Sequence, residues 1–426
     1  MLRPVPSRDA AARLGEDLLR IRPTDHELHE VLDLRGQLLA SLPHLLAEAM
    51  NLRADDLAQP FFTGLLPEGN FLRIVARAYG VSAANSFKLL EDIGGECAGA
   101  ISLVTPGADR LPAWEQRTLD APSLFRLIDE LPSRPLLVAD GEGLRLSLAG
   151  AQDKLPVFTG EHGISITGGN PPSTDIIKIP DARFPGLVTN EAFCLSLARS
   201  VGLDAAEASP QVTYPGDTHA GDPKEFLLVK RYDRWRDETG IPHRIHQEDL
   251  CQATGIAPGS KYEAEGGPGL EKCCALLERE CAVPAVDRLR FVDGVIFNFL
   301  IGNHDAHAKN WSLLLEGPDT PRLAPMYDLV STAVYPGLDR KMAMKIGGEY
   351  RPEWIRSRHL ERMASEAGMS AGGLRDRAGA LVERVGKTAP QLRAQQAARN
   401  SDSTLDAIAA VIEERSQILR DALAEM

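Results

Sequence analysis

The spacing of apolar residues changes from a helical period to a period of two and back again along this chain, and this order limits the folds that the chain can adopt. Between residues 140 and 232, short runs of alternating apolar and polar residues are separated by glycine turns, a period of two that is typical of antiparallel strands. The expected strands here are Leu144–Leu148, Leu155–Thr159, Ile164–Thr167, Asp175–Pro180 and Phe226–Lys230, with one helix at Asn190–Val201. From Gln247 onward helical spacing dominates. The sequence therefore predicts an α+β fold with a β-rich N-lobe and an all-helical C-lobe.

The region before these two lobes is also expected to be mostly helical, and so is the end of the helical lobe. Residues 1–58 look helical, and residues 60–104 predict helices that end in a strand at Ala100–Val104. Another helix is expected at Ser123–Leu131, followed by a proline-marked boundary near 132–136. The C-terminal region is helical, with a polar loop over residues 389–404. The predicted domains are 1–58, a helical-looking N-terminal segment; 59–135, an N-terminal subdomain; 136–232, the β-rich lobe; and 233–426, the helical lobe.

Charge and cysteine content narrow the function classes. The chain has 47 basic and 60 acidic residues, a formal net charge of −13, so strong unaided binding to nucleic acid is not expected. No run of 18 uncharged apolar residues is present, and the first residues do not form a secretory signal. The six cysteines form no CxxC pair and are expected to be reduced and buried. These features predict a cytoplasmic protein without a membrane segment.

One motif, GNHDAHAKN at Gly302–Asn310, carries the chemistry of phosphoryl transfer. That reaction needs a carboxylate to accept the proton of the nucleophile, and oxygen ligands to hold Mg²⁺. Asp305 and Asn310 have four residues between them, as the base and the metal-binding asparagine of protein kinases do. A strand is expected next at Trp311–Glu316, and Asp328 follows where a second metal carboxylate is needed.

The histidines of the same motif allow another interpretation. His304 and His307 could belong to a two-metal phosphoesterase, in which a GNHD motif also occurs. That chemistry needs further metal-binding motifs upstream and downstream, and the chain lacks them at suitable positions. His307 is therefore expected to reach a phosphate or to orient the loop.

Three further segments predict nucleotide contacts. The loop SLAGAQDK at Ser147–Lys154 contains small residues that let backbone N–H groups approach phosphates, although an ordinary hairpin turn explains it equally well. Lys178 lies within an apolar strand, where a kinase places its phosphate-binding lysine, and Glu191 could be its partner. Lys230–Tyr232 would offer backbone groups to adenine, or would be only an edge strand.

Together these segments resemble the HipA-like family of bacterial serine/threonine toxin kinases, over roughly residues 60 to 350. The resemblance implies a two-lobed protein-kinase-like fold with an N-terminal subdomain, Asp305 as catalytic base, and Mg²⁺ held by Asn310 and Asp328. It also implies self-inactivation by autophosphorylation at Ser147. The residues implied to bind ATP are Ala149, Gly150, Ala151, Gln152, Asp153, Lys154, Lys178, Lys230, Arg231, Tyr232, His307 and Asn310. Residues 1–58 are expected to diverge from the family.

The same resemblance implies a biological setting. It suggests the toxin of a type II toxin–antitoxin system, a helix-turn-helix antitoxin partner (HipB-like), and operator DNA reached indirectly through that antitoxin. The implied substrate is an aminoacyl-tRNA synthetase or a similar translation protein, and the implied outcome is growth arrest and persistence. Two alternatives stay open, a catalytically silent antitoxin-bound repressor component and a lipid or small-molecule kinase of related fold.

Overall fold

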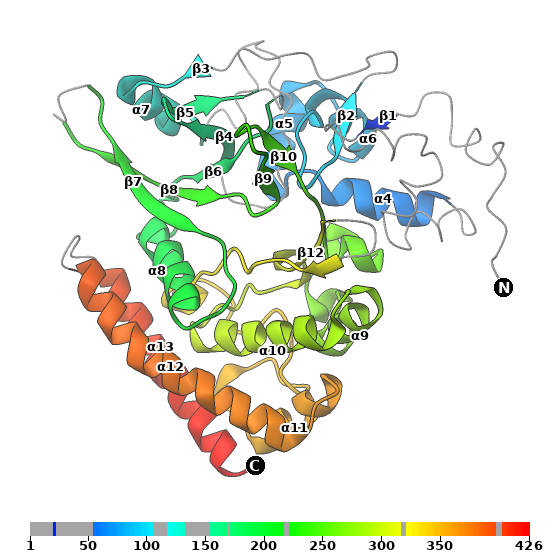
Figure 1. Cartoon of the computed structure of the whole chain (residues 1–426), viewed down its shortest axis with the longest axis vertical. Helices are drawn as coiled ribbons and strands as arrows, with labels where there is room; N and C mark the ends of the chain where they lie inside the picture. The colour runs from blue at the N-terminus through cyan, green and yellow to red at the C-terminus, as the bar shows by residue number, and fades with distance from the viewer. Residues whose placement is uncertain are drawn as a thin grey trace. The chain divides into compact units, whose positions relative to one another are not determined.

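The computed structural model describes residues 20–22, 54–104, 117–132, 154–167, 171–216, 221–316, 321–397 and 403–426. They form two compact units (Figure 1). The first unit runs to Ile179 and includes 211–258 and 314–321, and the second comprises 180–210, 259–313 and 322–426. We describe each unit by itself.

The first unit begins with a helical subdomain. Its helices are α4 (Ala54–Gly64), α5 (Gly69–Ala78), α6 (Ser86–Ile93) and α7 (Ala121–Glu130). Side-chain caps begin two of them: Asn85 accepts a hydrogen bond from the N–H of Lys88, and Asp120 accepts one from the N–H of Ser123. Strand β1 (Arg20–Arg22) pairs with β2 (Ser102–Val104). The helix expected over residues 1–58 is therefore wrong at β1, where the backbone is paired in a sheet.

A six-stranded sheet follows, with strand order β3-β5-β4-β6-β8-β7. Its strands are β3 (Arg117–Thr118), β4 (Lys154–Gly160), β5 (Gly163–Ile166), β6 (Asp175–Lys178), β7 (Ala208–Thr213) and β8 (Lys224–Lys230). The pairs β4–β5, β4–β6 and β6–β8 are antiparallel. This confirms four of the five strands expected in the β-rich lobe; the fifth, Leu144–Leu148, lies outside the described residues.

The two faces of this sheet differ in chemistry. Because directly opposed residues share a face, Leu155 and Ile177 lie on one side, and both are fully buried in the core formed with α4 to α7. Lys154, Lys178 and Leu227 are aligned in register on the other side, which we call the lysine face. The sheet therefore packs one face on the helical subdomain and presents two cations on the other.

A buried group of charged side chains, which we call the ion cluster, joins the helical subdomain to the sheet. Its members are Glu96, Ser173, Arg231, Asp233, Arg234 and Arg244. The carboxylate of Glu96 accepts hydrogen bonds from Ser173 and lies 3.2 Å from Arg234 Nη2. Asp233 accepts a 2.7 Å bond from Arg231 and a 3.0 Å bond from the N–H of Gly99. The cluster thus connects segments far apart in sequence.

Short strands also occur after residue 232. They are β9 (Arg234–Arg236), β10 (Pro242–Arg244), β11 (His246–Asp249), β12 (Ser312–Leu315) and β13 (Pro321–Leu323). Asp237 shapes the β9–β10 turn by accepting hydrogen bonds from the N–H groups of Thr239 and Ile241. The expectation that residues 233–426 are all helical is therefore wrong, although the strand expected near 311–316 is confirmed as β12.

Helices dominate the second unit. They are α8 (Leu187–Ser200), α9 (Leu270–Glu280), α10 (Pro284–Leu300), α11 (Ser357–Glu366), α12 (Ala371–Ala397) and α13 (Ser403–Ala424). Short 3-10 turns lie at Gln252–Thr254, Pro258–Ser260, Glu263–Glu265, Ala308–Asn310, Thr332–Val334 and Pro352–Trp354. Among the described helices, none combines the length and apolar composition needed to cross a bilayer.

Two helices differ from expectation. The helix α8, expected to belong to the sheet lobe, packs against α12 and α13 of the second unit, which lie side by side (Figure 1). The loop expected over 389–404 is wrong up to Ala397, because α12 continues through Pro390. All six cysteines are buried and form no disulfide, as expected.

The ion cluster predicts a large stability effect for Glu96. Burial alone would raise the pKa of Glu96, but Arg244, Arg234 and Arg231 outweigh it and hold the pKa below its usual value. Glu96→Ala leaves buried cations uncompensated, so we expect a loss of about 3–5 kcal/mol in the free energy of unfolding. Glu91→Ala, in the exposed pair with Lys88, should cost less than about 1 kcal/mol.

Urea unfolding of both variants measures the difference. The lowered pKa also means that the contribution of Glu96 is present above the pKa of the unfolded state and is lost as the pH falls through the folded pKa. Equal stability losses in the two variants would show that the cluster does not hold the unit together.

Candidate active site

Helix α10 leads directly into the loop at residues 303–310. The helix ends at Leu300, and Gly302 then adopts a φ of 68°, a left-handed conformation that favours glycine. Near the middle of the helix, Gly294 lies so close to Trp311 that an added Cβ would be 2.4 Å from the indole ring. The absence of a side chain at Gly294 thus lets the end of the loop pack directly on α10.

The side chain of Asn303 holds this loop in place. Its Oδ1 accepts a hydrogen bond from the N–H of Asp305 (3.1 Å). Its Nδ2 donates to Asn298 Oδ1 (2.8 Å) and to the carbonyl oxygen of Asp328 (3.3 Å). One buried amide therefore fixes the position of Asp305 relative to Asp328, although the two residues are far apart in sequence.

Asp305 presents a carboxylate at the surface of the loop. Its side chain is 52% exposed, and Tyr262 donates a 2.5 Å hydrogen bond from its hydroxyl to Oδ1. The ring of Tyr262 also contacts His307 edge to face, at a centroid distance of 5.2 Å. The phenol therefore orients an accessible carboxylate, which has the chemistry that a general base requires.

His307 is a neutral imidazole in this loop. Burial, followed by the positive charges of Lys261 and Lys309, lowers the pKa of His307 to about 3. Its Nε2 lies 4.0 Å from Asp305 Oδ1, and its buried Nδ1 makes no hydrogen bond to the described residues. A buried polar atom of this kind needs a partner, and a phosphate oxygen or a water molecule would supply one.

Asn310 and Asp328 offer oxygen ligands of the kind that Mg²⁺ prefers. Asn310 Nδ2 donates to the carbonyl oxygen of Asp305 (3.0 Å), which leaves its Oδ1 for a cation. Asp328 has a φ of 52°, the only positive value among the described non-glycine residues. Mg²⁺ is usually held by one or two carboxylates together with substrate phosphates and water, so an amide oxygen and a carboxylate fit this ion.

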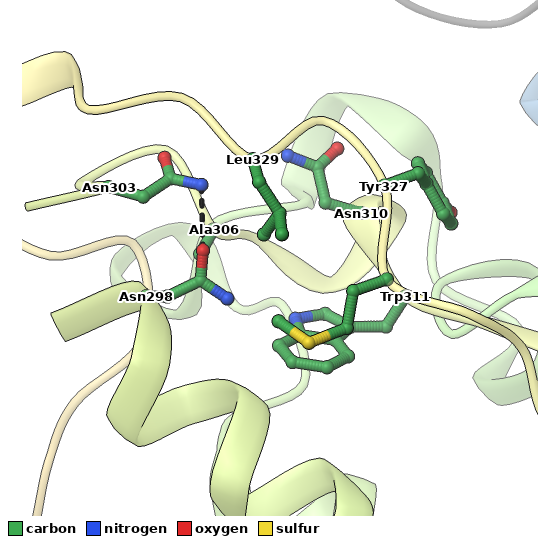
Figure 2. Close-up of a pocket in the computed structure, with 8 residues that line it drawn as sticks. Asn298, Asn303, Ala306, Asn310, Trp311, Tyr327 and Leu329 are labelled. Carbon is green, nitrogen blue, oxygen red and sulfur yellow. Dashed lines mark hydrogen bonds between the residues drawn. The ribbon is translucent and has the colours of Figure 1, made fainter. Parts of the chain in front are cut away.

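A narrow hollow borders Asn310. Figure 2 shows Asn303 bonded to Asn298, with Leu329 between Asn303 and Asn310 in this view. The lining residues are Asn298, Asn303, Ala306, Asn310, Trp311, Met326, Tyr327 and Leu329. The metal-ligand candidate Asn310 therefore borders a recess of the second unit that is lined by both polar and apolar side chains.

The other expected nucleotide residues belong to the first unit. Lys178 is 5% exposed and lies opposite Lys154 on the lysine face. Two neighbouring cations on one face suit a phosphate group. The loop residues Ser147, Ala149, Gly150, Ala151, Gln152 and Asp153 lie outside the described residues.

In the segment Lys230–Tyr232, one backbone group is already bonded within the first unit. The N–H of Arg231 donates to the carbonyl oxygen of Thr174 (2.9 Å), and its side chain lies in the ion cluster. The backbone donor of Arg231 is therefore already used, and the adenine contacts expected from the other backbone groups of Lys230–Tyr232 stay a prediction. Lys230 is exposed, and Tyr232 donates its hydroxyl proton to Gln247 (2.5 Å).

Three residues of this arrangement were not found from sequence. Tyr262 and Glu96 reach their partners across long sequence separations, which residue spacing does not reveal. Asn303 does lie inside the GNHD motif, and its position next to the histidine and aspartate was the signal that could have found it.

Comparisons with known proteins support the family expected from sequence. Residues 146–392 match the HipA-like C-terminal domain, and residues 29–104 match the HipA N-terminal domain. The second match begins before residue 59, so residues 29–58 follow the family pattern, contrary to the expected divergence of the whole segment 1–58.

Individual relatives agree with these matches. The chain is 42% identical over 390 residues to the putative kinase Y4mE of Sinorhizobium fredii, covering 90% of this chain and 85% of that protein. It is 33% identical over 307 residues to the serine/threonine-protein kinase toxin HipA of Shewanella oneidensis, covering 69% of this chain and 68% of that protein.

A solved structure gives the same result for the fold. The complex of HipA, HipB and operator DNA from Shewanella oneidensis matches this chain with a TM-score of 0.70 at 26% identity. The match covers 87% of this chain and 85% of that one. The expected kinase-like fold is therefore confirmed at the level of architecture.

The hydrogen bonds of Asn303 predict a local effect on the loop. In Asn303→Ala, the N–H of Asp305 and the side chain of Asn298 lose their partner, so we expect a loss of about 1–3 kcal/mol in stability. Hydrogen–deuterium exchange should speed up over residues 303–310 and stay unchanged in α12. Unchanged exchange in the loop would contradict the role of Asn303.

Proposed function

This chain belongs to the HipA-like kinase family, and from that premise we propose that it is a Mg²⁺- and ATP-dependent serine/threonine protein kinase, the toxin of a type II toxin–antitoxin system. The observation that carries the proposal is the loop in which one amide, that of Asn303, fixes Asp305 relative to Asp328. Phosphoryl transfer requires a general base and a metal ligand from the protein.

Asp305 is the proposed general base. Its carboxylate is accessible, and one oxygen accepts the hydrogen bond from Tyr262, which orients the group toward an incoming hydroxyl. The proton of a serine or threonine hydroxyl passes to this carboxylate as the oxygen attacks the terminal phosphorus of ATP. The bond from that phosphorus to the bridging oxygen breaks, and ADP leaves with the electron pair. The position of the base contributes typically about 10²–10⁴ in rate.

Asn310 and Asp328 are the proposed Mg²⁺ ligands. The ion, when bound, neutralises charge on the phosphates. Asn310 has a free amide oxygen for this purpose, since its nitrogen is bonded to the loop backbone. Lys178 and Lys154, opposed on the lysine face, are proposed to bind phosphate oxygens of ATP. Neutral His307 has a buried nitrogen that is suited to a further phosphate contact.

The proposed partners follow from the relatives. The Shewanella oneidensis protein is found in a complex with HipB and operator DNA. We extend this to a helix-turn-helix antitoxin for the present chain, which would reach DNA only through that antitoxin. The net charge of −13 supports this indirect route, because a protein this acidic is repelled by phosphate backbones. The proposed substrate is an aminoacyl-tRNA synthetase or a similar translation protein.

Substitution of the two carboxylates tests the activity. Asp305→Ala and Asp328→Ala should each lower phosphoryl transfer by at least about 10²-fold, because base and metal act at one transition state. Affinity for Mg²⁺·ATP should fall less in Asp305→Ala, since only Asp328 is expected to hold the ion. Radiolabel transfer and nucleotide titration measure both effects. Growth arrest that persists in cells expressing either variant would refute the kinase-toxin proposal.

Ser147 tests the proposed self-inactivation. Phosphorylation would add about −1.5 to −2 charges next to the proposed phosphate-binding loop, and this charge should repel ATP. Wild-type protein incubated with Mg²⁺ and ATP should acquire phosphate on Ser147 and lose nucleotide binding, whereas Ser147→Ala should keep binding. If mass spectrometry finds no phosphate on Ser147 in an active preparation, self-inactivation is refuted. The loop at Ser147–Lys154 would then be interpreted as an ordinary hairpin turn.

A further inference from the structure

The stretch Asp339–Arg351 lies directly against the loop that carries Asp305. The carbonyl oxygen of Asp339 accepts a 3.2 Å hydrogen bond from His304 Nδ1, and the N–H of Ala343 donates to the carbonyl oxygen of His304 (2.9 Å). His304 is the residue next to Asp305. These bonds fix the stretch beside the proposed base.

Glu263 attaches the same stretch to the segment that carries Tyr262. The N–H of Glu263 donates to the carbonyl oxygen of Ala343 (3.1 Å). The carboxylate of Glu263 accepts a 2.7 Å bond from the N–H of Lys345 and lies 3.4 Å from Lys345 Nζ. Tyr262, which bonds to Asp305, is the neighbouring residue. The stretch therefore borders Asp305 through two independent sets of contacts.

This stretch carries four cations in a chain of net charge −13, and we call them the basic rim: Arg340, Lys341, Lys345 and Arg351. Arg340 and Lys341 are exposed, and the other two are half-buried. Lys345 is paired with Glu263, whereas the other three rim cations have no carboxylate at ion-pair distance in the described part of the chain.

The two acidic residues of the stretch form no ion pair with the rim cations. Asp339 Oδ1 accepts a hydrogen bond from the backbone N–H of Lys341 (3.0 Å), and Glu349 Oε1 accepts one from the N–H of Arg351 (2.9 Å). Both carboxylates are therefore used in shaping the backbone. Lys345 is paired with Glu263, and the guanidinium of Arg351 lies over the ring of Trp354. Arg340 and Lys341 are therefore the rim cations left for a partner.

We propose that the basic rim binds acidic residues next to the serine or threonine that this protein phosphorylates. The inference rests on the proposed function and names its substrate class: a hydroxyl-bearing segment flanked by aspartate or glutamate. A hydroxyl that reaches Asp305 brings its neighbouring residues past Arg340 and Lys341. Charges placed in this way select among partners more than they add affinity.

The chemistry favours an acidic polypeptide over a nucleic acid. The rim is four cations within twelve residues, whereas the rest of the chain is strongly acidic and repels a long polyanion. A few carboxylates beside a serine match the size and charge of the rim without bringing further negative charge against the remaining surface.

Peptide binding to the full chain tests the rim without relying on catalysis. The probe is a fluorescent serine peptide flanked by glutamates, compared by anisotropy with the same peptide carrying glutamines. The acidic peptide should bind roughly 10-fold more tightly at low salt, and the difference should shrink at high salt because the charges are exposed. Arg340→Glu/Lys341→Glu, and the milder Arg340→Gln/Lys341→Gln, should remove the difference.

A matched control separates the rim from overall charge. Arg384 and Lys387 are exposed on α12, so Arg384→Glu/Lys387→Glu makes the same change in net charge elsewhere. This variant should keep the preference for the acidic peptide. Equal binding of both peptides by the wild type, equal loss in both double variants, or tighter binding of a single-stranded oligonucleotide of the same charge would overturn the inference.

Kinetics distinguish this inference from the proposed function. In active protein, the rim variant should raise KM for the acidic peptide several-fold with kcat and ATP affinity unchanged, since no rim residue is in the catalytic machinery. Phosphate transfer to both peptides at equal KM would overturn the rim alone. A wild type that prefers the acidic peptide but transfers no phosphate to any acceptor would overturn the proposed function and leave the rim standing.

Discussion

The arrangement of the loop at residues 303–310 depends on a single buried amide. Asn303 accepts from the backbone of Asp305 and donates to the carbonyl oxygen of Asp328, so it sets the position of the proposed base relative to the proposed metal ligand. A side chain with both a donor and an acceptor is needed for this, which aspartate or leucine could not replace. Two further features fix the segments that Asn303 connects. The positive φ of Asp328 sets the backbone on one side, and the close contact between Gly294 and Trp311 holds the end of the loop against α10.

Charge organises the first unit in two ways. Inside it, the ion cluster satisfies buried arginines with Glu96 and Asp233, which links the helical subdomain to the strands. On the lysine face, Lys154 and Lys178 lie directly opposite each other. The proposed function places phosphate oxygens of ATP against this pair. The unit thus uses paired charges for stability and like charges for the proposed binding of nucleotide.

Periodicity predicted the parts of the fold that bury one regular face. Strand β4 was predicted because its apolar residues alternate, and helix α8 because a long, mostly apolar run ends at Gly202. Strand β7 was not, because it is a polar, mostly exposed strand containing Pro210. The end of α12 was predicted as a loop because its residues are polar and exposed around Pro390. For the site, spacing named Asp305, Asn310 and Asp328, but contacts such as that of Tyr262 depend on tertiary structure, which spacing does not contain.

Calorimetric titration of the purified chain with Mg²⁺·ATP tests the central claim, that these residues form a kinase nucleotide site. Wild-type protein should bind one nucleotide per chain, and Lys178→Met should weaken that binding at least about 10-fold, because a buried positive charge next to the phosphates is lost. Lys88→Met, at an exposed position on α6, is the matched control and should bind as the wild type does. Equal affinity in Lys178→Met and wild type, with both proteins folded, would contradict the account.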